Sequence, residues 1–139
     1  RLSTAFIPEL SLVAVASDQG IVLGHILLTR AQLLRGETSQ PMALLALAPL
    51  SVHPDFQRRG IGSQLINAAH EKARRLGFGA IIVVGHADYY PRFGYRQAKD
   101  YGISFPFHVA DECGMVVELK PGALCNYSGC VRYDPAFGL

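Results

Sequence analysis

Apolar residues are concentrated in three stretches in the first part of the chain. The first two, Leu10–Ala16 and Ile21–Thr29, are short, rich in β-branched and aliphatic residues, and predict two strands. Asp18-Gln19-Gly20 between them has the composition of a tight turn, so the pair is expected to form a hairpin. The third, Met42–Val52, predicts another strand. Pro49 inside it predicts a local break or bulge, because proline cannot donate to a strand ladder.

The apolar spacing becomes helical after Gly60. Between Gly60 and Leu76, the apolar residues recurring on one helical face are Ile61, Leu65, Ala68, Ala69, Ala73 and Leu76. Gly77 follows at a position where glycine commonly ends a helix. Arg35–Gln40 is polar and predicts a loop, and His53-Pro54-Asp55 predicts a turn before the helix.

Shorter elements are predicted in the second half of the chain. Strands are expected at Ala80–Val84, Gly114–Leu119 and Cys130–Tyr133, with one helical turn at Asp88–Arg92. The resulting order of strands and helices is that of a mixed α/β domain built around one sheet.

The composition predicts one globular domain that spans residues 1–139. Half of the residues are hydrophobic and 17% are charged, which is enough apolar material for a core. The net charge of +2 argues against a general nucleic-acid binder. No signal-peptide pattern or membrane-length apolar stretch is found, so a cytoplasmic protein that does not bind membranes is expected. Cys113, Cys125 and Cys130 lack a C-x-x-C pair, which argues against a disulfide framework, and no metal is expected.

The connection between the third strand and the helix has the features of an anion site. It reads Gln57-Arg58-Arg59-Gly60-Ile61-Gly62, so two glycines and two cations stand at a helix N-terminus, where backbone N–H groups are unpaired. The plainer interpretation is that the glycines only ease a tight connection. A Walker loop would need a lysine after Gly62, and a dinucleotide fingerprint would need a third glycine, so both nucleotide motifs fit poorly.

Two motifs in this chain resemble those of the GNAT superfamily of acyl-CoA N-acyltransferases. Gln57-x-x-Gly60-x-Gly62 resembles the Q/R-x-x-G-x-G/A signature, and Tyr90-Pro91-Arg92-Phe93-Gly94-Tyr95 resembles the Y-x-x-x-G-F/Y element. The resemblance extends over roughly Leu10–Leu119 and is greatest to small bacterial members of the family.

The resemblance implies a central, mostly antiparallel sheet with a splayed strand pair and flanking helices. It also implies transfer of an acetyl group from acetyl-CoA to a primary amine by direct attack in a ternary complex. Backbone groups of Leu50 and Val52 would bind the pantetheine arm, and the N–H near Leu50 would polarise the thioester carbonyl. Tyr90 aligns with the tyrosine that protonates the leaving thiolate, and Tyr89, one residue away, remains an alternative. The residues implied to bind the cofactor are Leu50, Val52, Gln57, Arg58, Arg59, Gly60, Ile61, Gly62 and Ser63.

The chain departs from the family pattern at two places. Many members carry a glutamate on the strand before the motif, but Met42–Val52 contains no carboxylate. The candidates for a general base are Glu37, His53, His86, Asp88 or a chain of water molecules. Arg1–Pro8 is too short for the usual first strand and helices, which are expected to be absent or to lie outside this chain.

These departures leave a second function open, a non-catalytic acyl-CoA-binding sensor or partner module. The acceptor amine, a small molecule or a peptide, is not identified by the sequence. The oligomeric state also stays open, with a homodimer as one option.

Overall fold

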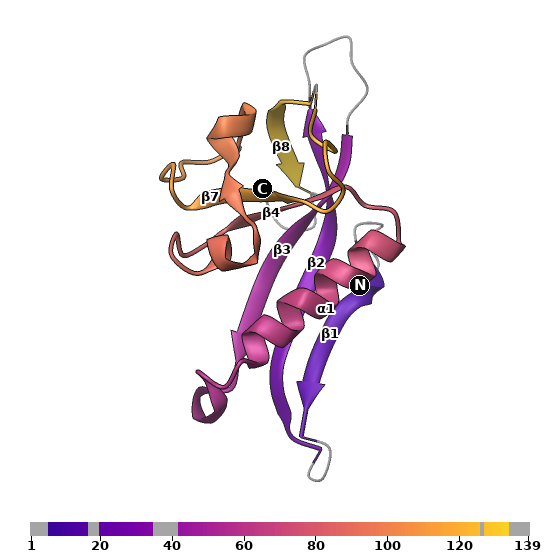
Figure 1. Ribbon diagram of the computed structural model, residues 1–139, viewed down its shortest axis with the longest axis vertical. Coiled ribbons are helices and arrows are strands. Elements are labelled where there is room, and N and C mark those ends of the chain that lie inside the picture. Colours follow the sequence, from indigo (N-terminus) through magenta and orange to yellow (C-terminus); the bar gives the residue numbers. More distant parts are fainter. Residues whose placement is uncertain (1–5, 17–19, 35–41, 126, 134–139) are drawn as a thin grey trace.

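The computed structural model describes residues 6–16, 20–34, 42–125 and 127–133, which form one curled sheet with a helix on one face (Figure 1). The sheet has eight strands in the order β5-β7-β4-β3-β2-β8-β6, and β1 pairs with β2 outside this path. Pairing is parallel between β3 and β4 and between β6 and β8, and antiparallel elsewhere. The elements are β1 (Phe6–Val15), β2 (Val22–Leu34), β3 (Met42–Val52), η1 (Pro54–Phe56), α1 (Ile61–Arg75), β4 (Ala80–Val84), η2 (Tyr90–Phe93), β5 (Arg96–Gln97), η3 (Ala98–Tyr101), β6 (Ile103–Ser104), β7 (Gly114–Glu118) and β8 (Gly129–Tyr133).

The predicted hairpin is confirmed, but its second strand is longer than expected. β1 and β2 are antiparallel, with Leu12 opposite Ile26. β2 continues past Thr29 to Leu34, because its second half pairs with β8, which comes almost 100 residues later in the chain. The expected turn residues Asp18 and Gln19, and the expected loop Arg35–Gln40, lie outside the described residues.

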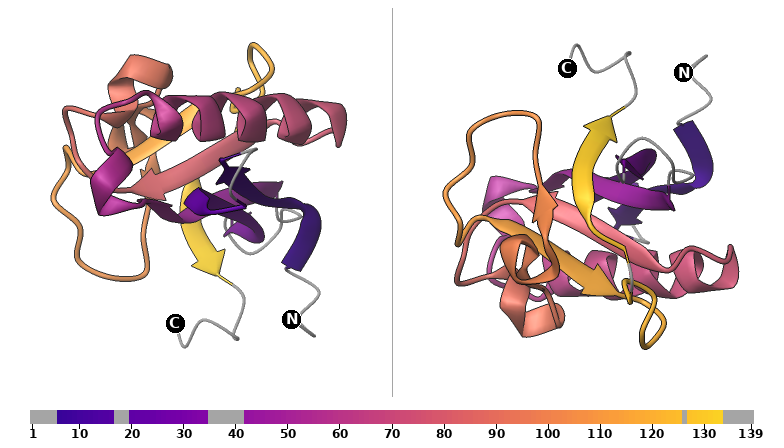
Figure 2. Two further views of the ribbon diagram at one scale, coloured as in Figure 1. Left: turned by 90° about the horizontal axis from the view of Figure 1, so that it is seen from below. Right: turned by 90° about the horizontal axis from the view of Figure 1, so that it is seen from above.

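Two apolar clusters fill the two faces of the sheet. Side chains of β3 alternate between them, with Leu45 and Leu47 in the cluster under α1 and Leu44 and Ala46 in the other. Figure 2 shows α1 along the first face. The second cluster contains residues of η3, β6 and β8. No helix in the described part of the chain is long and apolar enough to span a membrane.

Helix α1 lies close to β2 because Gly24 has no side chain. A Cβ at Gly24 would stand 3.0 Å from Leu65 Cδ1 and 2.9 Å from the Ser51 carbonyl oxygen. The helix ends as predicted, with Gly77 at φ 93° and its N–H donating to the Arg74 carbonyl at 3.0 Å.

The buried face of α1 differs in part from the predicted one. Ala68 and Leu76 were predicted on the apolar face, but both are exposed, whereas Ile66 and His70 are buried. His70 can be buried because its Nε2 has a hydrogen-bond partner in the Tyr95 hydroxyl, 2.9 Å away. The other four predicted positions are buried as expected, namely Ile61, Leu65, Ala69 and Ala73. An apolar pattern misses His70 because it counts histidine as polar.

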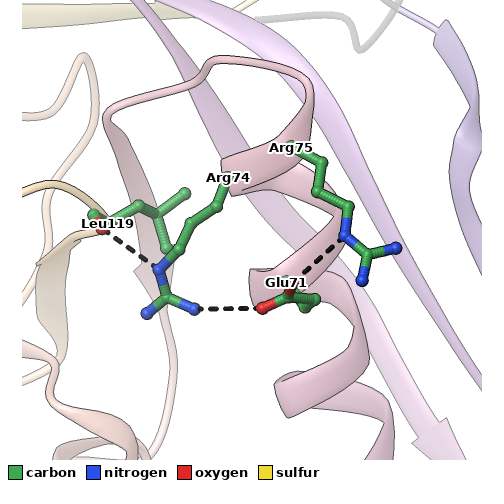
Figure 3. Close-up of polar contacts among 4 residues, drawn as sticks. All are labelled: Glu71, Arg74, Arg75 and Leu119. Carbon is green, nitrogen blue, oxygen red and sulfur yellow. Dashed lines mark hydrogen bonds and ion pairs between the residues drawn. The ribbon is translucent and has the colours of Figure 1, made fainter.

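The C-terminal turn of α1 is tied to the strand β7. Arg74 Nε donates to the carbonyl of Leu119, just after β7, at 3.1 Å (Figure 3). Glu71 accepts from Arg75 Nε at 3.1 Å and lies 3.9 Å from an Arg74 nitrogen. These exposed ion pairs contribute little individually, but the Arg74 hydrogen bond fixes the end of the helix against the sheet.

Candidate active site

The strands β3 and β4 separate part-way along their length. They pair only over Leu45–Leu47, opposite Ile81–Val83, and beyond Leu47 the strand β3 pairs with β2 alone. β4 ends at Val84. The splayed pair expected from the sequence is therefore present, with an unpaired edge of β3 on the side of the gap.

The break predicted at Pro49 is a β-bulge. The register between β2 and β3 shifts by one residue, because Ile26 is opposite Leu50 whereas Leu28 is opposite Leu47. A one-residue shift reverses which side chains face each side of a sheet. Leu50 and Val52 consequently pack toward the cluster under α1. Without the bulge, Ser51 would take this position.

Backbone groups after the bulge point in alternate directions. The N–H of His53 donates to the Leu23 carbonyl of β2 at 2.7 Å. Because successive residues of a strand point their backbone groups to opposite edges, those of Leu50 and Val52 face away from β2 and into the gap. The Val52 carbonyl, which accepts from Gln57 Nε2 at 3.2 Å, fits this direction.

The N-terminus of α1 has no side-chain cap. Gly60 is the N-cap residue in the left-handed conformation, with φ 80°, and the first helical bond runs from Gln64 N–H to the Gly60 carbonyl at 3.0 Å. The N–H groups of Ile61, Gly62 and Ser63 thus have no acceptor within the helix. Arg58 also adopts a positive φ, 67°, which costs a non-glycine residue about 1 kcal/mol or more. The strained residue Arg58 therefore stands next to unpaired N–H groups at the positive end of the α1 dipole.

The two tyrosines of the second motif lie at different places. A Cβ at Gly62 would stand 2.6 Å from the Tyr89 hydroxyl, so that hydroxyl lies against the loop at the start of α1. A Cβ at Gly85 would stand 2.5 Å from Tyr90 Cε2, so the Tyr90 ring lies on the backbone just after β4, beside the gap. The Arg92 guanidinium lies over the Tyr89 ring, 4.8 Å from the ring centroid.

Tyr90 is held by aromatic contacts and is largely buried. Its ring meets those of Tyr89 and Tyr95 edge-on, at centroid distances of 5.2 and 5.6 Å. Burial, and secondarily the neighbouring Tyr89, raises the pKa of Tyr90 above its ordinary value of 10.0. The phenol is therefore protonated at neutral pH and can donate a proton.

These segments enclose a groove of about 660 Å³. It is lined by Leu50, Val52, Gln57, Arg58, Gly60, Ile61, Gly62, Ser63, His86, Tyr89, Tyr90 and Arg92. Every predicted site residue except Arg59 is among them. The Arg59 guanidinium lies instead over the Phe56 ring, 5.2 Å from its centroid.

Comparisons with known proteins identify the family. Residues 9–97 match the family model of the acetyltransferase (GNAT) domain. The chain belongs to the GNAT acetyltransferase family.

Relatives of this GNAT chain include the uncharacterized N-acetyltransferase YjhQ of Escherichia coli strain K12, which is 38% identical over 133 residues, 91% of this chain and 71% of that protein. A similar solved structure is the E. coli GNAT family N-acetyltransferase YhbS in complex with CoA, with TM-score 0.83 and 22% identity over 93% of this chain and 69% of that chain. Another is a GNAT family acetyltransferase from Brucella melitensis in complex with acetyl-CoA, with TM-score 0.67 and 28% identity over 91% of this chain and 67% of that chain. The expected family, fold class and acyl-CoA-dependent acetyltransferase class are confirmed.

The GNAT groove contains one of the four general-base candidates. His86 lines it, whereas His53 is exposed outside it and its Nδ1 accepts from the Asp55 N–H at 3.1 Å. Asp88 is exposed and outside the groove lining, and Glu37 lies outside the described residues.

Sequence reasoning gave no binding role to Arg92, which also lines the groove. The signal for it was its place inside the second GNAT motif, beside two tyrosines. The three cysteines are free thiols, and among the described residues no group of three or more acidic, histidine or cysteine side chains converges on a metal-sized site.

The buried pair His70 and Tyr95 packs next to the GNAT site, because the Tyr95 ring contacts the Tyr90 ring. Burial, with the Arg74 cation as the smaller cause, lowers the pKa of His70 from 6.5 to about 4. The unfolded chain therefore binds more protons between these two pH values, and stability present above pH 6.5 is lost as the pH falls toward 4. The loss is on the order of 3 kcal/mol.

We expect His70→Gln to remove this part of the pH dependence. Glutamine can keep a hydrogen bond to the Tyr95 hydroxyl but does not titrate. Urea unfolding at several pH values should show the wild-type free energy of unfolding falling more steeply below pH 6.5 than that of the variant. Parallel curves for the two proteins would contradict a neutral, buried His70.

Proposed function

We propose that this protein transfers an acetyl group from acetyl-CoA to a primary amine by direct attack within a ternary complex. The observation that carries the proposal is one groove joining the uncapped N-terminus of α1, the open edge of β3 and Tyr90. The first suits a diphosphate, the second suits an amide-containing arm, and the third supplies a proton donor. Acetyl-CoA carries a diphosphate, an amide-containing arm and a thioester in this order, so its thioester would lie near Tyr90.

The cofactor would lie along the groove with its diphosphate at the loop. The unpaired N–H groups of Ile61, Gly62 and Ser63, with the Arg58 guanidinium, would bind the diphosphate. The pantetheine amides would pair with the backbone of Leu50 and Val52, as a further strand pairs with a sheet edge. This arrangement supports a thioester beside the Leu50 N–H, which would stabilise negative charge on its oxygen.

The chemistry then follows from the groups at the gap. The amine nitrogen attacks the thioester carbonyl carbon, and the carbonyl oxygen becomes an oxyanion. The C–S bond breaks, Tyr90 donates its proton to the leaving sulfur, and the protonated amine nitrogen loses a proton that restores the phenol through solvent. The phenol is a weaker acid than a thiol even at its ordinary pKa, and burial raises the pKa of Tyr90 further. The proton released by the acylated nitrogen, which is a much stronger acid, therefore makes the overall transfer favourable. The products are the acetylated amine and coenzyme A.

The amine proton has to be removed by a group in the groove or by water. No carboxylate is among the residues lining the groove. His86 is the candidate that the groove favours, with water as the alternative. The same observation favours a second candidate function, an acyl-CoA-binding module without catalysis.

We expect acetyl-CoA to stabilise the protein against heat. A ligand that binds only the folded state adds about 2.7 kcal/mol at 100 times its dissociation constant. Differential scanning fluorimetry with acetyl-CoA, ATP and NAD measures this effect, and stabilisation by ATP or NAD alone would contradict the proposed ligand. Turnover with a panel of small amines and peptides, followed by free thiol release, separates an enzyme from a binding module.

A further inference from the structure

Arg92 is a second cation in the groove, across from the loop at the start of α1. The charged or titratable side chains lining the groove other than the two tyrosines are Arg58, His86 and Arg92, with no carboxylate among them. Arg58 belongs to the loop that would bind the diphosphate, whereas Arg92 belongs to η2 on another wall. The groove therefore receives positive charge from two separate segments of the chain.

The Arg92 guanidinium is held in place but keeps its hydrogen-bonding capacity. It lies 4.8 Å from the centroid of the Tyr89 ring, and the hydroxyl of that ring lies against Gly62. No ion pair in the described part of the chain involves Arg92. A guanidinium stacked on an aromatic ring still presents N–H donors at its edge, in a geometry that matches phosphate.

Tyr89 also sets the distance between the loop and Arg92. Its hydroxyl lies against Gly62 and the Arg92 guanidinium lies 4.8 Å from the centroid of its ring, so the two are about one aromatic ring apart. This is the scale of the ribose in coenzyme A, which carries the diphosphate on its 5′-oxygen and a separate phosphate on its 3′-oxygen. With the diphosphate at the loop, the remaining phosphate monoester is the anion that a second guanidinium would bind.

We propose that Arg92 binds the 3′-phosphate of coenzyme A and makes the groove selective for the phosphorylated cofactor. The inference rests on the proposed function, since it needs coenzyme A in this groove. It assigns to Arg92 a task separate from the chemistry at Tyr90, and it gives the Tyr89 ring the task of positioning the guanidinium.

The test compares coenzyme A with 3′-dephospho-coenzyme A by isothermal titration calorimetry. We expect wild-type protein to bind coenzyme A about fivefold or more tightly than the dephospho form, the scale of one partly exposed charged hydrogen bond. Arg92→Gln should bring this ratio close to one by weakening only coenzyme A. Arg96→Gln removes the same charge from an exposed residue outside the groove lining, and should keep the wild-type ratio.

The possible outcomes separate the two proposals. Equal weakening of both ligands by Arg92→Gln would place the guanidinium on the diphosphate and overturn the inference. An unchanged ratio in Arg92→Gln would overturn it as well, while leaving the proposed function standing. Failure of wild-type protein to bind either ligand would overturn the proposed function itself.

Discussion

Tyr90→Phe is expected to lower kcat by about 10²- to 10⁴-fold and to leave acetyl-CoA affinity nearly unchanged. Phenylalanine keeps the ring that lies on Gly85 and meets Tyr95 at 5.6 Å, so the packing survives. Only the hydroxyl is lost, and with it the proposed donor to the leaving thiolate. An interaction made in the transition state alone appears in kcat and not in ground-state binding. Steady-state kinetics with an acceptor from the amine panel, together with calorimetric binding, measure both quantities.

Tyr89→Phe is the informative comparison, because it removes the same atom one residue earlier. The Tyr89 hydroxyl lies against Gly62, at the loop and away from Gly85, so its loss should act on cofactor affinity more than on kcat. A large loss of kcat in Tyr89→Phe, with near-normal turnover in Tyr90→Phe, would exchange the roles of the two tyrosines. If chemistry is rate-limiting and neither variant loses turnover, another group protonates the thiolate.

Gly62→Val is expected to weaken coenzyme A binding at least about 100-fold. The new side chain would place a Cβ 2.6 Å from the Tyr89 hydroxyl and would displace this ring from the loop. Its branches would also cover the N–H groups proposed to bind the diphosphate. Losing two charge-assisted hydrogen bonds of about 1.5–3 kcal/mol each accounts for a change of this size. Binding can be measured by calorimetry on a variant whose circular dichroism matches wild type.

Gln64→Val is the matched control for this experiment. It also places a β-branched residue in the first part of α1, at an exposed position outside the groove lining. It adds the same side chain to the first turns of α1, costs only a few tenths of a kcal/mol in helix propensity, and should keep the affinity for coenzyme A. Unchanged affinity in a folded Gly62→Val variant would mean that the loop only connects β3 to α1.

Local sequence was sufficient for the elements and motifs that depend on neighbouring residues. Gly60 takes the left-handed conformation that the start of α1 requires, and Ala80–Val84 forms the strand that its apolar run predicted. Pro49 marks the bulge in β3, since proline lacks the N–H that a regular ladder would use. The two motifs identified the family because each is a short run of consecutive residues.

Tertiary structure decided the features that depend on distant partners. β2 extends to Leu34 because β8 pairs with it, and the two-residue strands β5 and β6 exist only through their pairing with β7 and β8. His70 is buried because Tyr95, 25 residues away, supplies its hydrogen bond. Arg92 reaches the groove because the fold places Tyr89, whose ring carries its guanidinium, against Gly62, 27 residues earlier in the chain. No local pattern contains such contacts, since each arises only when the folded sheet brings separate segments together.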